Sequence, residues 1–60
     1  MTETQIRNQL RKNRLTGRGP RSLYQLAQTW GVSRSMLTMA VKDPKRYPGV
    51  RARIEKALAP

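Results

Sequence analysis

The nine residues from Arg34 to Lys42 carry the side chains best suited to recognition chemistry. If this segment is helical, its outward side presents a guanidinium, two hydroxyls, a thioether and an ammonium, and no acid. The residues on that side are Arg34, Ser35, Thr38, Met39 and Lys42. Cationic groups bind phosphates, and guanidinium and hydroxyl groups hydrogen-bond the edges of bases. The side chains of this face therefore suit the reading of base edges and the binding of phosphates.

The chain as a whole is strongly basic, with 13 Lys and Arg against 3 Asp and Glu in 60 residues, a formal net charge of +10. A compact domain with this charge needs an anionic partner or a screening cloud of counterions, and nucleic acid is the first candidate for a partner. The candidates for phosphate contacts are Arg18, Arg21, Ser22, Ser33, Lys42, Lys45 and Arg46. We interpret the other cations near the N-terminus as solvated charges: Arg7, Arg11, Lys12 and Arg14.

The residues for most other chemistry are missing from the sequence. It contains no Cys and no His, and its acids, Glu3, Asp43 and Glu55, lie far apart. These gaps argue against a metal site, a cofactor and an enzyme, because no nucleophile–base pair and no phosphate-binding Gly loop can be found. No apolar run approaches the roughly 20 residues of a membrane span, and no secretory signal is visible. We therefore expect a cytoplasmic protein of a bacterial host, with no membrane or small-molecule partner.

Hydrophobic spacing and helix breakers predict an all-α fold in one domain over residues 1–60. We expect a basic helix over 3–14, a helix-turn-helix over 22–42 and a closing helix over 48–59. Ser22 and Ser33 are good N-caps for the two motif helices, and Gly31 suits the bend between them because it tolerates a positive φ.

The expected core is formed by apolar positions at helical spacing in each segment. They are Ile6, Leu10, Leu23, Leu26, Ala27, Trp30, Val32, Met36, Leu37, Ala40, Val41, Val50, Ile54, Ala57 and Leu58. The charged residues of the last helix are expected outside or on the border of its apolar stripe: Arg51, Arg53, Glu55 and Lys56.

Several short runs between Arg21 and Leu58 form a recognisable set. They are Arg21-Ser22-Leu23-Tyr24-Gln25-Leu26-Ala27, Gly31-Val32-Ser33, Leu37, Ala40-Val41, Tyr47-Pro48 and Ile54-Glu55-Lys56-Ala57-Leu58. This set resembles the small phage regulators of the Cro and lambda-repressor-like superfamily, and most closely the Ner-like DNA-binding proteins. The resemblance implies a small four- to five-helix lambda-repressor-like helix-turn-helix domain. It also implies that Arg34 and Ser35, with Thr38 and Met39 one turn further on, meet base edges.

Together these features predict a sequence-specific regulator of transcription that binds double-stranded DNA, namely a phage or prophage repressor that acts by occupying its operator. If a second copy pairs with it on DNA, the operator has two half-sites about 34 Å apart. Two alternatives stay open: an RNA-binding protein that uses the same basic surface, and a small basic inhibitor that docks on an acidic host protein. The shortage of exposed aromatic residues argues against reading of single strands.

Overall fold

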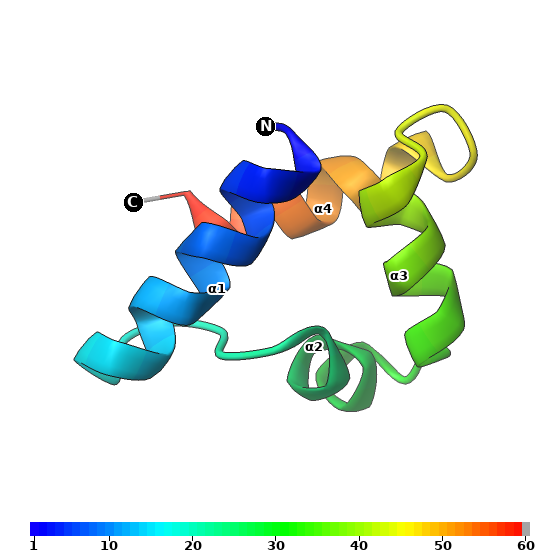
Figure 1. Cartoon of the computed structure of the whole chain (residues 1–60). Coiled ribbons are helices and arrows are strands. Elements are labelled where there is room, and N and C mark those ends of the chain that lie inside the picture. The colour runs from blue at the N-terminus through cyan, green and yellow to red at the C-terminus, as the bar shows by residue number, and fades with distance from the viewer. Residues whose placement is uncertain (60) are drawn as a thin grey trace.

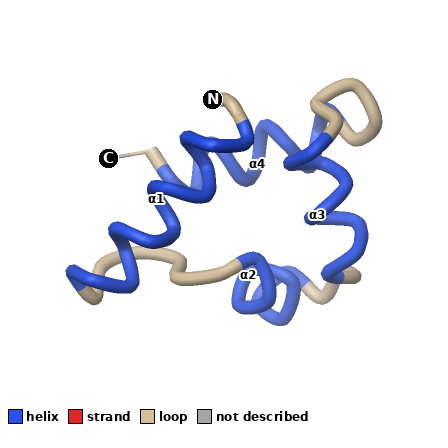
Figure 2. The backbone as a smooth tube through the Cα atoms, in the orientation of Figure 1, coloured by secondary structure: helices blue, strands red, loops and turns tan. Residues whose placement is uncertain are grey.

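The computed structural model describes residues 1–59, and Figures 1 and 2 show its four helices. They are α1 (Glu3–Thr16), α2 (Leu23–Trp30), α3 (Arg34–Lys42) and α4 (Pro48–Leu58). No strand occurs within residues 1–59, so the all-α prediction is confirmed. The bounds of α3 are as predicted, whereas α1 continues past Arg14 to Thr16 and α4 ends at Leu58 instead of Ala59. In the same part of the chain, no helix is both long and apolar enough to cross a membrane.

Local side-chain hydrogen bonds explain where the first helix begins and ends. The hydroxyl of Thr2 accepts a hydrogen bond from the Gln5 amide, and the Gln5 side chain accepts one from the Thr2 amide, which is a complete capping box. Gly17 ends α1 with φ 71°, in the left-handed region where other residues are strained.

One helix, α3, packs against each of the other three, while α1 also packs against α4. The buried core follows from this arrangement and draws on all four helices. It consists of Ile6, Leu10, Leu26, Ala27, Leu37, Ala40, Val41, Ile54 and Leu58. Because α3 provides Leu37, Ala40 and Val41 to the centre of this core, its inner face is fixed and its outer face is left to solvent.

Six residues expected in the core lie at its edge instead. The partly buried residues are Leu23, Trp30, Val32, Met36, Val50 and Ala57. The guanidinium of Arg53 stacks over the Trp30 ring at 4.4 Å from the ring centroid. This cation–π contact joins α2 to α4.

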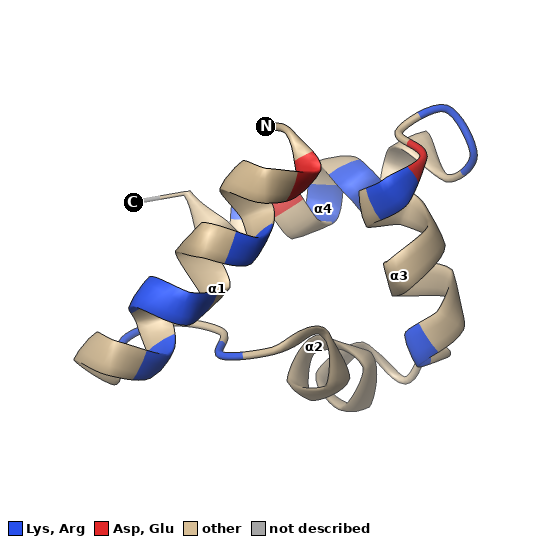
Figure 3. Ribbon diagram, viewed as in Figure 1, with Lys and Arg blue, Asp and Glu red and all other residues tan. Residues whose placement is uncertain are grey.

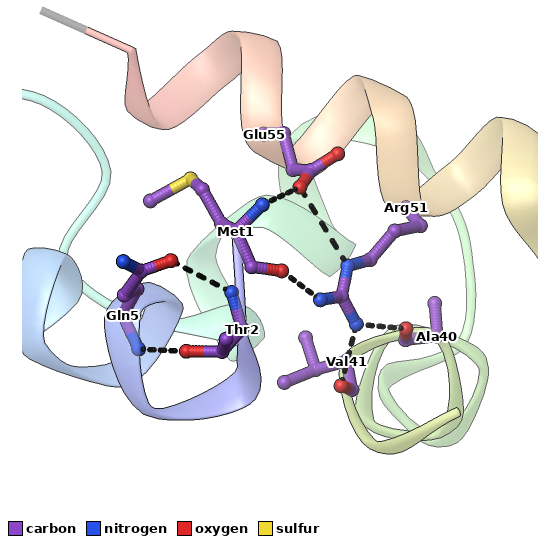
Figure 4. Close-up of polar contacts among 7 residues, drawn as sticks. All are labelled: Met1, Thr2, Gln5, Ala40, Val41, Arg51 and Glu55. Atoms are coloured by element: carbon purple, nitrogen blue, oxygen red, sulfur yellow. Dashed lines mark hydrogen bonds and ion pairs between the residues drawn. The ribbon is translucent and has the colours of Figure 1, made fainter. Parts of the chain in front are cut away.

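The expectation that Arg51 lies outside or on the border of the apolar stripe of the last helix is wrong. Its side chain is buried, with 7% of the residue exposed. Figure 4 shows its Nη1 donating hydrogen bonds to the carbonyl oxygens of Ala40, at 3.0 Å, and Val41, at 2.7 Å, and its Nη2 donating to that of Met1. Burial of a charged side chain is tolerated here because backbone oxygens of α3 and of the N-terminus surround the guanidinium.

Candidate nucleic-acid interface

The turn between α2 and α3 redirects the chain so that α3 exposes one face. Gly31 adopts φ 66° and ψ 32°, a left-handed conformation that the sequence predicts for this position. The Val32 amide donates to the Ala27 carbonyl at 3.0 Å, which closes the end of α2. Ser33 then begins α3 by accepting a hydrogen bond from the Met36 amide at 3.0 Å. A Cβ at Gly31 would meet no atom within 4 Å, so the positive φ alone explains the glycine.

All four predicted base-reading residues lie around one shallow groove on the outer side of α3. The groove has a volume of about 460 Å³ and is lined by Arg34, Ser35, Thr38, Met39 and Lys42, a set we call the reading face. Thr38 is half-buried and the other members of the set are exposed. The lining contains no acid, so the whole face presents hydrogen-bond donors, cations and one thioether to solvent.

Hydroxyl groups on and beside this face are partly engaged in the helices themselves. The Thr38 hydroxyl donates to the Arg34 carbonyl at 3.0 Å, and its oxygen is therefore left to accept from a ligand. The hydroxyls of Ser22 and Ser33 accept from backbone amides as N-caps, so their protons remain for donation to a phosphate. The predicted phosphate-binding role of both serines is compatible with capping.

A second concavity adjoins the reading face and collects arginines from separate parts of the chain. This cleft has a volume of about 300 Å³ and is lined by Arg7, Leu10, Arg14, Arg21, Ser22, Leu23, Tyr24, Arg34 and Thr38. We call it the arginine cleft. Arg34 and Thr38 line both concavities, so they form one continuous surface. The inclusion of Arg7 and Arg14 was missed from the sequence, because only the packing of α1 beside α3 brings them to this place.

The remaining predicted phosphate contacts are exposed but lie in loops outside both concavities. Arg18 belongs to the loop that joins α1 to α2, and Lys45 and Arg46 to the loop that follows α3. Figure 3 shows basic residues along α1, in the loops and toward both ends of α3. Lys45 and Arg46 follow Lys42 closely in the sequence but do not line the groove of the reading face. Arg18 lines neither concavity.

Acidic residues neutralise little of this positive surface. Within residues 1–59 the ion pairs join Glu3 to Arg7, at 3.1 Å, and Glu55 to the N-terminal amine and Arg51. In the same residues, Arg14, Arg21, Arg34 and Lys42 have no carboxylate within 4.0 Å. The acid at the α3 terminus, Asp43, accepts from the Lys45 amide.

Comparison with protein-family descriptions, curated proteins and solved structures finds no significant match to this chain.

Proposed function

We propose that the chain is a sequence-specific, double-stranded DNA-binding regulator, a phage or prophage repressor with a lambda-repressor-like helix-turn-helix fold. The observation that carries this proposal is the acid-free reading face on α3, which stands outside the core and beyond a sharp turn at Gly31. An α-helix with its side chains is about 10–12 Å across, and the major groove of DNA is about 12 Å wide. The dimensions of α3 and its side chains therefore suit insertion into the groove.

The residues divide into those that select sequence and those that attach the protein. Arg34 leads the first turn of α3, where a guanidinium can donate two hydrogen bonds to a guanine. Ser35, Thr38 and Met39 follow on the same face, with Met39 suited to contact with a thymine methyl group. Lys42 and the cations around the face neutralise phosphates, which fixes the register of the helix along the duplex. Repression follows when the occupied site overlaps a promoter.

In vitro selection from random duplexes tests this proposal, with a random RNA pool and an acidic-protein pulldown as parallel arms. We expect enrichment of one short duplex motif, and two copies of it about 34 Å apart if the protein pairs on DNA. Enrichment of RNA alone, or capture of a protein without any shifted duplex, contradicts the proposal and favours one of the two alternatives.

The salt dependence of binding to the selected duplex gives an independent check. Each neutralised phosphate adds about −0.9 to the slope of log K against log salt. Several contacts are expected, because the reading face and its surroundings hold several cations without acidic partners in residues 1–59. A flat plot contradicts binding through phosphates.

A further inference from the structure

We propose that the arginine cleft is a phosphate-binding site and that, in the complex, it holds the DNA backbone beside the groove that α3 enters. This inference rests on the proposed function and assigns a role to α1, whose cations were interpreted from the sequence as solvated charge. In the complex, α1 would then be a second binding element that contacts the duplex next to the reading helix.

The charge of the cleft is the first argument. Its lining includes four arginines, which are Arg7 and Arg14 of α1, Arg21 of the following loop and Arg34 of α3. No carboxylate lines it. Glu3 pairs with Arg7 through Nε, at 3.1 Å, which leaves the two terminal nitrogens of that guanidinium for another acceptor. Like charges collected in one concavity repel, and an anion with several oxygens relieves this repulsion.

The position of the cleft is the second argument, and it favours a backbone phosphate over a free anion. Arg34 and Thr38 line both the cleft and the groove of the reading face. A ligand that fills both must be continuous, with base edges in the groove and phosphates in the cleft. Arg34 and Thr38 occupy the junction, and Arg7, Arg14 and Arg21 extend the contact away from the reading face.

Two double variants of α1 test the assignment with equal loss of charge. Arg7→Gln/Arg14→Gln removes two cations that line the cleft, whereas Arg11→Gln/Lys12→Gln removes two exposed cations that do not. Circular-dichroism melts establish that both variants are folded. Affinities for the selected duplex and for a random duplex are then measured across a series of salt concentrations.

We expect Arg7→Gln/Arg14→Gln to lower the affinity for both duplexes by about tenfold or more. The slope of log K against log salt should become shallower by about 2, and the preferred motif should not change. Arg11→Gln/Lys12→Gln should change the slope by less than half as much. Equal effects of the two double variants, or an unchanged slope in the first, overturn the role of the cleft while duplex binding itself stands.

A titration with pyrophosphate, followed by amide shifts of residues 21–24, separates this inference from the proposed function. If the wild type binds no duplex but binds pyrophosphate, and Arg7→Gln/Arg14→Gln does not, the cleft is a phosphate site and the DNA-binding function is overturned. If the wild type binds neither duplex nor pyrophosphate, both proposals are overturned.

Discussion

Nη1 of Arg51 lies 2.7 Å from the carbonyl oxygen of Val41, and this hydrogen bond ties α4 to the last turn of α3. The same nitrogen also binds the Ala40 carbonyl, whose usual helical donor would be the amide of residue 44. That residue is Pro44, which has no N–H. Arg51 therefore replaces a missing backbone donor, and its charge suits the negative end of the helix dipole.

Replacement of Arg51 should destabilise the fold through these unsatisfied carbonyls. We expect Arg51→Met to lower the free energy of unfolding by about 2–3 kcal/mol, the scale of lost hydrogen bonds to a charged group. Arg53→Met is the matched control, because Arg53 is exposed and contacts the Trp30 ring, and its cost should stay below about 1 kcal/mol. Thermal melts that shift equally in the two variants would contradict the supporting role of Arg51.

Glu55 makes the stability of the chain dependent on acid pH. The hydrogen bond from the N-terminal amine, 2.5 Å away, lowers the pKa of Glu55 below its ordinary value of 4.5, and the charges of that amine and Arg51 add to the effect against some desolvation. Since the folded-state pKa is depressed, the stabilisation is present above the unfolded value and is lost as pH falls through the folded one. Melts of the wild type should therefore decline more steeply than those of Glu55→Gln below about pH 4.5. Parallel curves would show that Glu55 is not linked to folding.

The core of the fold depends on Leu26, which is 4% exposed. Leu26→Ala should cost about 2–4 kcal/mol by leaving a cavity, enough to unfold much of a domain this small. Leu15→Ala provides the same substitution at a position that is 81% exposed, where a change within about 0.5 kcal/mol is expected. Trp30→Ala should fall between them, because Trp30 is only partly buried. Chemical denaturation measures all three, and an undiminished stability of Leu26→Ala would refute its place in the core.

The sequence predicts the helices well because their signals are local. The caps at Ser22 and Ser33 and the glycine at position 31 act within one turn of their position, and the structure confirms each of them. The face shared by Arg34, Ser35, Thr38 and Met39 follows in the same way from the helical repeat.

Long-range features escaped prediction because they depend on packing between helices. The amide of Asn13 is buried and donates to the Pro20 carbonyl at 2.8 Å, which fixes the path of the loop after α1. Arg51 reaches carbonyls ten and eleven residues earlier in the chain, and no charge pattern indicates that an arginine in α4 turns inward. The same reason explains why the sequence did not predict that Arg7 and Arg14 line one cleft with Arg21 and Arg34.

Arg34 should carry the largest single share of base selection. Arg34→Ala is expected to weaken the selected duplex by about 1–3 kcal/mol and to relax the preference at one base position. Lys56→Ala removes one charge from an exposed position on α4 and should change both quantities little. Titrations against single-base variants of the selected site measure the profile, and an unchanged profile for Arg34→Ala would remove Arg34 from the reading residues.

Thr38 should accept, not donate, in the complex, because its hydroxyl proton is already given to the Arg34 carbonyl at 3.0 Å. Its partner would then be the amino group of adenine or cytosine. We expect Thr38→Val to lose about 1 kcal/mol of affinity and to become insensitive to removal of that amino group from the base. Thr29→Val is the matched control, since Thr29 donates in the same manner to the Gln25 carbonyl, on α2. If Thr38→Val remains as sensitive as the wild type, the contact does not exist.

The contact surface itself can be mapped by amide chemical shifts during titration with the selected duplex. If α3 enters the major groove, the signals of residues 33–42 and 21–24 shift and saturate with the duplex, while exposed positions of α4, such as Ala52 and Lys56, stay unchanged. Shifts confined to α4, or none along 34–42 at saturation, would contradict recognition of DNA by the outer face of α3.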